Sequence, residues 1–238
     1  MPKQSVVIFG ASGAIGQALC ESFLAKDFEV VAISRAERTP NDPRSKADWL
    51  VWDVSDGGGA LVAFDNSRQF DAVVWAQGVN CSDDIYTFDL KAHEEIYAAN
   101  VTYILVSLQV LLRHNLLTPS ARLCIISSIW QNLARQNKLS YCITKSALQG
   151  LVQSLAVDLG RSGYLVNAVL PGALDTPMTR ANLSGEQISR LEGMTPLGSL
   201  PELNDVCNLV GFLCSRDNTG ITGQFIAADR GFSYARIV

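Results

Sequence analysis

A tyrosine, a lysine and a serine in this chain have a spacing that could support proton transfer. Tyr141 and Lys145 are four residues apart in a predicted helix, so their side chains share one face of that helix. A free tyrosine has a pKa of about 10, and a nearby ammonium group lowers that pKa by stabilising the phenolate. Ser128 ends a predicted strand, where its hydroxyl could hydrogen-bond a substrate oxygen. Because Tyr–Lys pairs at this spacing are common on helix surfaces, they indicate catalysis only together with further features of the chain.

A glycine-rich segment follows the first predicted strand. Residues 10–16 read Gly-Ala-Ser-Gly-Ala-Ile-Gly and lead directly into a predicted helix. Glycine permits unusual backbone angles and lets a pyrophosphate approach the main chain, while the helix N-terminus supplies free N–H groups. A plain strand-to-helix turn is the alternative for this segment taken alone. We expect a dinucleotide to bind here through Gly10, Ser12, Gly13, Ile15 and Gly16.

The second predicted strand ends in residues that could select the cofactor. In dinucleotide-binding folds an acid at this position binds the adenosine ribose and favours NAD. This chain has Ser34 followed by Arg35 instead. A guanidinium beside a small hydroxyl can hold a 2′-phosphate, which favours NADP over NAD, whereas a solvated loop arginine is the alternative.

Strand-like and helix-like segments alternate along the chain. The predicted strands are 5–9, 29–34, 48–52, 71–75, 122–127, 165–170 and 224–228, and the predicted helices are 13–26, 93–114, 140–159 and 203–214. Nearly continuous apolar strands that alternate with helices indicate a parallel sheet covered on both faces. We therefore predict an α/β fold in one domain, residues 1–238, with a doubly wound, Rossmann-like, mostly parallel seven-stranded sheet. The polar segment 36–47 is expected to be a surface loop, and segment 173–201, rich in proline and glycine, a substrate lid.

Composition and charge argue against several classes of function. The net charge is −4 and no cluster of basic residues is visible, so we expect no nucleic-acid partner. The longest apolar stretch, 101–112, is too short to span a bilayer, and no secretion signal is visible, so we expect a cytoplasmic protein without a membrane partner. The six cysteines are scattered and are expected to be free thiols, most of them buried. Without a cluster of cysteine and histidine we predict no catalytic metal.

These motifs together resemble the short-chain dehydrogenase/reductase family over nearly the whole chain. Tyr141-Cys-Ile-Thr-Lys145 matches the YxxxK of that family, and Ser128 matches its serine. Asn100 matches the asparagine that orders a water in the proton relay of the family, and Asp53-Val54 resembles the segment whose acid contacts adenine. Four further residues resemble the N…PGxxxT pattern, whose threonine holds the nicotinamide amide: Asn167, Pro171, Gly172 and Thr176.

The resemblance implies an NAD(P)-dependent oxidoreductase. Tyr141 would be the general acid in reduction and the base in oxidation, Lys145 would bind the nicotinamide ribose, and Ser128 would steady the substrate oxygen. Hydride would pass between the nicotinamide and a small, possibly polar, carbonyl or alcohol substrate. We expect carbonyl reduction with NADPH, and a homo-oligomer, a dimer or a homotetramer, assembled through the two long helices.

The sequence departs from the family pattern at three places. The GxxxGxG loop has Ala14 at its middle position and a glycine at Gly13 instead, a spacing typical of the longer, extended relatives. The NNAG after the fourth strand reads Trp-Ala-Gln-Gly at 75–78, and only Gly78 is retained. The final DGG has Arg230 at its centre, which could bind a substrate carboxylate or phosphate or else form a surface salt bridge.

Two rival functions follow from the same residues. A 3-oxoacyl-carrier-protein reductase would need a basic docking patch, and the chain offers only scattered arginines such as Arg113, Arg122 and Arg135. A non-catalytic regulator that senses a dinucleotide would use the same fold. The complete set of Ser128, Tyr141, Lys145 and Asn100 argues against that regulator, because a sensor has no need for a proton relay.

Overall fold

One parallel sheet forms the centre of the molecule. The computed structural model describes residues 3–35, 47–54 and 68–234, so the predicted loop at 36–47 lies almost wholly outside the described residues. The strands are β1 (Ser5–Phe9), β2 (Glu29–Ser34), β3 (Asp48–Val51), β4 (Phe70–Trp75), β5 (Leu117–Ile126), β6 (Leu165–Pro171) and β7 (Phe225–Ala228). Their order across the sheet is β3-β2-β1-β4-β5-β6-β7, and every pairing among the described residues is parallel. The predicted doubly wound, seven-stranded sheet is therefore confirmed.

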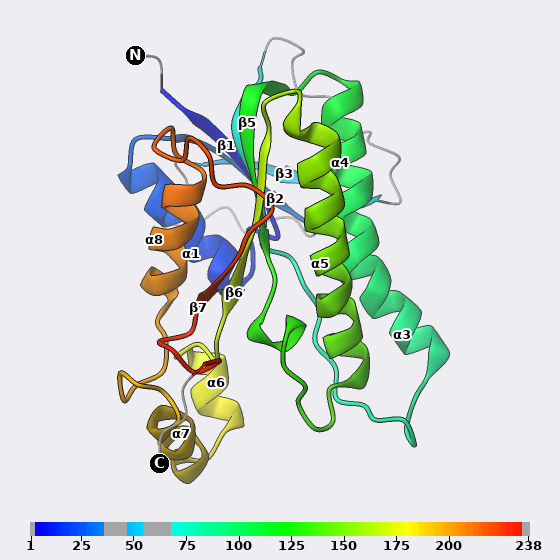
Figure 1. Ribbon diagram of the computed structural model, residues 1–238, viewed down its shortest axis with the longest axis vertical. Coiled ribbons are helices and arrows are strands. Elements are labelled where there is room, and N and C mark those ends of the chain that lie inside the picture. Colours follow the sequence, from blue (N-terminus) through cyan, green and yellow to red (C-terminus); the bar gives the residue numbers. More distant parts are fainter. Residues whose placement is uncertain (1–2, 36–46, 55–67, 235–238) are drawn as a thin grey trace.

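Helices cover both faces of this sheet. α1 (Ala14–Ala25) and α8 (Leu203–Leu213) lie on one face, whereas α4 (Tyr103–Arg113) and α5 (Leu139–Gly160) lie on the other (Figure 1). Each face buries its own apolar cluster, because successive side chains of a strand point to opposite faces. The central strands are accordingly buried along most of their length, as the five buried residues of β1 show.

An aromatic cluster packs at the C-terminal ends of β1, β3 and β4. The rings of Phe9 and Trp75 stack with their centroids 5.9 Å apart, and Tyr103 packs edge-on against both Phe9 and Trp52. The buried indole N–H of Trp75 donates to Ser107 Oγ at 2.8 Å, so its polar group is paired. The loops that follow β1, β3 and β4 therefore start from a rigid base.

The helix predicted at 93–114 is divided into two helices in the structure. α3 (Leu90–Tyr97) begins after Asp89, whose side chain accepts from Ala92 N at 2.7 Å, and a π-helical turn, Ala98–Thr102, separates α3 from α4. An inserted turn of this kind is common at functional sites and does not alter the apolar periodicity enough to be predicted. The run Leu90–Arg113 has the length and apolar composition of a membrane span. Half of its apolar 18-residue stretch, however, is buried inside the domain.

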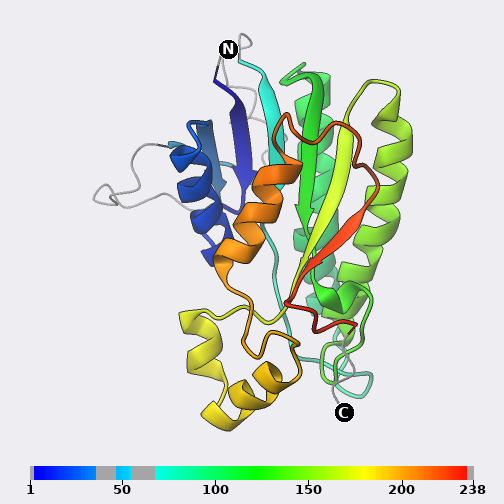
Figure 2. The ribbon, with the colours of Figure 1, turned by 60° about the vertical axis from the view of Figure 1, so that its left-hand side comes forward.

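The crevice of the fold lies where the strand order reverses, between β1 and β4. The chain leaves β1 toward β2 on one side, whereas β4 leads to β5 on the other, so the loops after these two strands diverge. Two short helices, α6 (Pro177–Asn182) and α7 (Gly185–Gly193), lie together beyond the C-terminal edge of the sheet (Figure 2). The predicted lid segment thus contains two helices and lies at the same end of the sheet as the crevice.

Candidate active site

The glycine-rich loop is shaped by close contacts that exclude side chains. Gly10 has a φ of +76°, and a Cβ there would lie 2.4 Å from the backbone nitrogen of Gln77. A Cβ at Gly16 would lie 2.2 Å from the carbonyl oxygen of Gly10. Both positions therefore require glycine, one for its backbone angle and both for the approach of neighbouring backbone.

The part of the loop with the shifted glycine spacing still leads directly into a helix. Gly13 has an ordinary φ of −75° and is the N-cap of α1, which begins at Ala14 without a side-chain cap. The first N–H groups of α1 therefore remain available, and a helix N-terminus of this kind attracts phosphate. The shifted glycine spacing is compatible with the geometry of an anion-binding turn.

A cavity of about 840 Å³ opens beside this loop. It brings together most of the residues that the sequence assigned to the cofactor: Gly10, Ser12, Gly13, Ser34, Arg35, Asp53, Val54 and Gly78. Ile15 and Gly16 are not among its lining residues, because Gly16 packs beneath the loop against the Gly10 carbonyl and Ile15 packs against the apolar cluster under α1. These two residues shape the loop from below.

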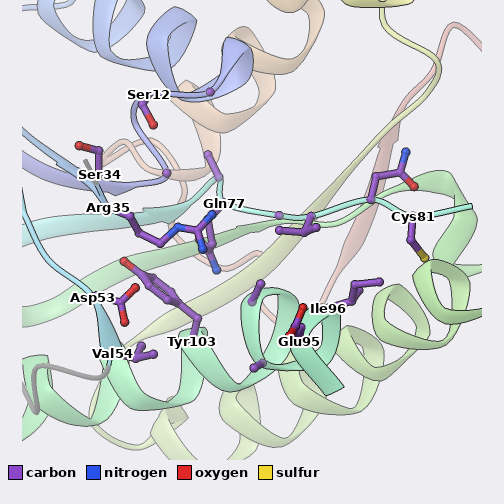
Figure 3. A pocket seen from close by; sticks show the side chains of 18 of the residues that line it. Ser12, Ser34, Arg35, Asp53, Val54, Gln77, Cys81, Glu95, Ile96 and Tyr103 are labelled. Atoms are coloured by element: carbon purple, nitrogen blue, oxygen red, sulfur yellow. The ribbon is translucent and has the colours of Figure 1, made fainter. Parts of the chain in front are cut away.

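The cavity has the size and the chemical groups to hold a dinucleotide. Arg35 extends across it toward Gln77 and Tyr103, and Asp53 and Val54 form the facing wall (Figure 3). Both amide atoms of Gln77, Nε2 and Oε1, are buried without a hydrogen-bond partner. Buried polar atoms are nearly always paired, so an unpaired amide in a lined cavity indicates a polar ligand. The tight glycine turn, the free helix N-terminus and this amide fit a nicotinamide dinucleotide.

Asn100 joins the cofactor cavity to the predicted catalytic helix. Its side chain is only 1% exposed and lies in the π-helical turn. Its Oδ1 accepts from Val79 N at 2.7 Å, and its Nδ2 donates to the Val79 carbonyl at 3.0 Å and to Thr144 Oγ1 at 3.0 Å. A Cβ on Gly78 would lie 3.4 Å from Asn100 Oδ1 and 3.6 Å from Lys145 Nζ. Asn100 thus fixes the loop after β4 against α5, and its predicted role in a water relay stays a prediction.

A second set of contacts ties the same loop to the start of α5. The Asp83 carboxylate accepts from Ser140 N at 3.1 Å, and the Lys138 ammonium donates to the Cys81 carbonyl at 2.6 Å. His93 Nδ1 lies 2.8 Å from Ser140 Oγ, which adds α3 to the same network. These contacts place the first turns of α5, and with them Tyr141, beside the loop.

Tyr141, Lys145 and Ser128 meet at the C-terminal edge of β5. Tyr141 forms a side-chain hydrogen bond with Ser128, and the Lys145 ammonium lies 5.7 Å from the centroid of the Tyr141 ring. The ammonium donates to the Ile126 carbonyl at 3.1 Å. The structure thus brings the three predicted catalytic residues together, on two elements that are adjacent only in the folded chain.

Burial controls the protonation of this trio. Burial raises the pKa of Tyr141, and the hydrogen bond with Ser128 opposes that change. The lower Tyr141 pKa that the sequence predicted is therefore wrong for the protein without ligands, because desolvation of the phenolate outweighs the effect of its neighbours. Burial also lowers the pKa of Lys145 from 10.5 to about 8, since its ammonium is desolvated and has a neutral carbonyl as its partner.

A second cavity, of about 610 Å³, lies on the other side of the loop after β4. Its wall includes Ile129 and Trp130, which directly follow Ser128, together with Thr179, Leu183 and Leu191 from the predicted lid segment. Asn80 lines both cavities. A cofactor in the first cavity and a substrate in the second would therefore meet beside Asn80, next to the trio.

The remaining predicted residues occupy different places. Pro171 ends β6, and a Cβ at Gly172 would lie 3.0 Å from Asp229 Cβ, a tight contact for an added side chain. Thr176 caps α6 by accepting from Thr179 N at 3.2 Å, and neither cavity described above includes these three residues in its lining. Their contact with nicotinamide stays a prediction.

Arg230 forms ion pairs within the domain. Its guanidinium lies 2.9 Å from Asp205 Oδ2 and 3.2 Å from Glu202 Oε1. Of the two alternatives for this departure from the family pattern, the structure has the salt bridge. The charge of Arg230 holds the start of α8 to the turn after β7.

Several residues of the site were missed by sequence reasoning. Gln77, Tyr103 and Glu95 line the first cavity, and Asn80 and Lys138 line the second. Gln77 and Asn80 follow a predicted strand, so the rule that ligands bind at the carboxyl ends of parallel strands could have identified them. Tyr103 and Glu95 lie on helices and give no such signal.

The chain is similar to known enzymes over nearly its whole length. The family model described as enoyl-(acyl carrier protein) reductase matches residues 10–233. A cis-4-hydroxycyclohexanecarboxylate dehydrogenase of Sinomonas cyclohexanicum is 26% identical over 97% of each chain. A 3-oxoacyl-[acyl-carrier-protein] reductase of Salmonella typhimurium is 25% identical over 94% of this chain and 95% of its own.

Solved structures share the fold. A gluconate 5-dehydrogenase from Burkholderia cenocepacia in complex with NADP and tartrate has a TM-score of 0.87 at 22% identity, covering 99% of this chain and 97% of its own. A short-chain dehydrogenase from Leptospira borgpetersenii with bound NAD+ has a TM-score of 0.85 at 21% identity, covering 98% and 94%. Similar folds thus hold either nicotinamide dinucleotide.

The buried charge of Lys145 should lower the stability of the protein in a pH-dependent way. Because the folded pKa of about 8 lies below 10.5, the unfolded state binds more protons between these values, and the free energy of unfolding rises with pH in that window. We expect the free energy of unfolding of Lys145→Met to exceed that of the native protein most strongly below pH 8. This difference should shrink by up to about 3 kcal/mol as the pH rises toward 10.5.

Urea denaturation of both proteins at several pH values from about 7 to about 10 measures this difference. The matched control is Lys91→Met, which removes an exposed lysine of α3 and should show no such trend. A stability difference between Lys145→Met and the native protein that stays constant with pH would contradict the depressed pKa.

Proposed function

The chain belongs to the short-chain dehydrogenase/reductase family, and we propose that it is an NADPH-dependent reductase of a small carbonyl compound. Family membership makes it an oxidoreductase that transfers hydride between a nicotinamide cofactor and a carbonyl or alcohol. The observation that carries the finer proposal is the meeting of Tyr141, Ser128 and Lys145 next to both cavities. A Cβ on Gly78, which lines the first cavity, would lie 3.6 Å from Lys145 Nζ, and Ser128 directly precedes two residues that line the second.

In the proposed reaction, Tyr141 and Ser128 act on one substrate oxygen. The dinucleotide, when bound, supplies the hydride. The Ser128 hydroxyl donates a hydrogen bond to the carbonyl oxygen and so polarises it, while the Tyr141 hydroxyl transfers its proton to that oxygen as negative charge develops there. The Lys145 ammonium, close to the Tyr141 ring, favours the phenolate that remains and binds the nicotinamide ribose.

The protonated Tyr141 can supply the proton that reduction requires. Burial raises its pKa above the ordinary value of 10, so the phenol is neutral at pH 7. Alcohol oxidation would use the phenolate of the same residue as base. The same residues catalyse both directions, since the transition state is shared.

Arg35 supports NADPH as the cofactor. Its side chain crosses the cavity next to Ser34, where a 2′-phosphate would be bound by a guanidinium and a hydroxyl (Figure 3). Asp53 and Glu95 line the same cavity, and their negative charges oppose binding of the 2′-phosphate. The cofactor preference therefore depends on Arg35 outweighing these two carboxylates.

Each rival function makes a different demand on the residues of the chain. A 3-oxoacyl-carrier-protein reductase shares the fold and the trio, and a relative of that kind is 25% identical. Its acidic carrier would need a basic docking patch. Arg113 lies at the end of α4 and Arg122 within β5, so these two arginines lie on different elements. A dinucleotide-sensing regulator would leave the trio unused. We keep a cytoplasmic homo-oligomer, a dimer or a tetramer, as part of the proposal.

Replacing Arg35 tests the cofactor preference. Charge-assisted hydrogen bonds contribute about 1.5–3 kcal/mol, so we expect NADPH to bind roughly tenfold to a hundredfold more tightly than NADH. Arg35→Ala should remove this preference without weakening NADH, while the control Arg113→Ala, at the far end of α4, should keep it. Fluorescence titration with both reduced cofactors measures the four affinities, and a native preference for NADH would refute the assignment.

Replacing Gln77 tests whether its unpaired amide contacts the cofactor. We expect Gln77→Ala to weaken NADPH binding roughly tenfold, because a buried hydrogen bond is lost, and to leave the melting temperature of the free protein unlowered, because two unpaired polar atoms are removed. The control is Gln69→Ala, at the opposite end of β4, where the amide donates to the Asn115 carbonyl. Unchanged NADPH affinity in Gln77→Ala would mean that the amide has no ligand.

Replacing Tyr141 tests the enzyme proposal against the regulator. Tyr141→Phe should lower turnover roughly 10²- to 10⁴-fold through loss of the proton donor, and leave NADPH affinity nearly unchanged. The measurement is NADPH oxidation over a panel of ketones and aldehydes, with Tyr164→Phe, which packs against the core, as control. Loss of NADPH binding together with turnover would make Tyr141 a structural residue.

A further inference from the structure

The second cavity has two positively charged side chains on one wall. Arg135 and Lys138 both line it, in the loop that connects Ser128 to α5. The Arg135 guanidinium packs over the Trp130 ring, 5.7 Å from its centroid. Across residues 3–35, 47–54 and 68–234, no hydrogen bond or ion pair is described for this guanidinium. Its five N–H donors therefore face solvent and the cavity.

Lys138 adds a positive charge that its own contacts do not neutralise. Its ammonium donates to Asn80 Oδ1 at 3.0 Å, to the Cys81 carbonyl at 2.6 Å and to Ser82 Oγ at 3.1 Å, and all three acceptors are neutral. Burial lowers the pKa of Lys138, and the charge of Arg135 lowers it further. Because both cations line the same cavity, an anion bound beside them would be stabilised by two positive charges.

Two carboxylates near this wall keep their charge but accept hydrogen bonds from neutral groups of the chain. Asp229 lines the cavity, but its two oxygens accept from Gly231 N at 2.9 Å and Ser233 N at 2.8 Å. Asp83, whose charge also acts on Lys138, accepts from the backbone N–H of Ser140 and the thiol of Cys81. Neither acid forms an ion pair with Arg135 or Lys138 in the described part of the chain.

The rest of the cavity is mixed, with polar side chains such as Asn137 and Thr195 beside an apolar part. Ile129, Trp130, Leu200, Pro201 and Phe232 contribute to its lining. The apolar part begins directly after Ser128, and Trp130 N donates to Ser128 Oγ at 3.3 Å. A ligand that enters this cavity beside Ser128 would therefore meet both apolar side chains and the two cations.

We propose that the substrate is a keto acid whose carboxylate binds Arg135, beside the positive charge of Lys138, while its carbonyl lies at Ser128 and Tyr141. The inference rests on the proposed carbonyl reduction and names its substrate class. A guanidinium binds a carboxylate with two parallel hydrogen bonds, and the ammonium of Lys138 supplies a second positive charge nearby. The cations would also orient the ligand, because only one end of it carries charge.

The test compares acids with neutral molecules of the same shape. The probes are 4-oxocyclohexanecarboxylate and 6-oxoheptanoate, each beside its own carboxamide, titrated calorimetrically into protein saturated with NADP+, so that binding is measured without turnover. We expect at least one keto acid to bind roughly tenfold more tightly than its carboxamide. Arg135→Gln should lower the affinity for that acid to that of the carboxamide, whereas Arg135→Lys should keep most of the preference.

The matched control is Arg161→Gln, an exposed arginine at the opposite end of α5, which should leave every affinity unchanged. Equal binding of acid and carboxamide, no binding of either, or a preference that survives Arg135→Gln would overturn the keto-acid inference. Turnover of the neutral ketones with NADPH would in those cases show that the proposed reduction still stands. Failure to bind NADP+ would refute the proposed function, and the inference with it.

Discussion

The hydrogen bonds of the Asn100 side chain are the contacts on which the whole site depends. They connect the loop after β4, the π-helical turn between α3 and α4, and α5 through Thr144. Each of these elements contributes to a different part of the site: the loop separates the two cavities, and α5 carries Tyr141 and Lys145. A buried amide with both its polar atoms paired to backbone and hydroxyl groups fixes one arrangement, because any slip would leave unpaired polar atoms in the interior.

The site is held in place at a cost in stability. Lys145 is 4% exposed and has a neutral carbonyl as its hydrogen-bond partner, and Gln77 buries two polar atoms without a partner. Each is unfavourable in the protein alone and becomes favourable with a polar or charged ligand beside it. The extensive apolar clusters on both faces of the sheet and the aromatic cluster at the strand ends offset that cost. Strain of this kind is typical of a preorganised functional site.

The two cavities divide the chemistry between the halves of the fold. The first lies over β1, β2 and β4, where the strand order reverses, and the second lies under α6 and α7, beyond the end of β6. The trio lies next to both cavities, on α5 and just after the end of β5. Such a division explains how relatives with the same fold can differ in substrate: the first cavity is built from sheet edge and helix start, and the second from loops that can vary in sequence.

The sequence by itself determined the fold and the trio. Apolar strands alternating with helices leave few arrangements other than a doubly wound parallel sheet, and the carboxyl ends of such strands place Gly10, Arg35 and Ser128 at one edge. Local pattern could not reveal the π-helical turn, because one inserted residue does not disturb the apolar spacing of α3 and α4. The protonation of Tyr141 and Lys145 likewise depends on burial by elements distant in sequence. Tertiary structure alone decided that burial raises the pKa of Tyr141, that Gln77 lacks a partner, and that Arg230 is paired whereas Arg135 has no ion pair among the described residues. Each of these depends on which groups are brought near the residue in space.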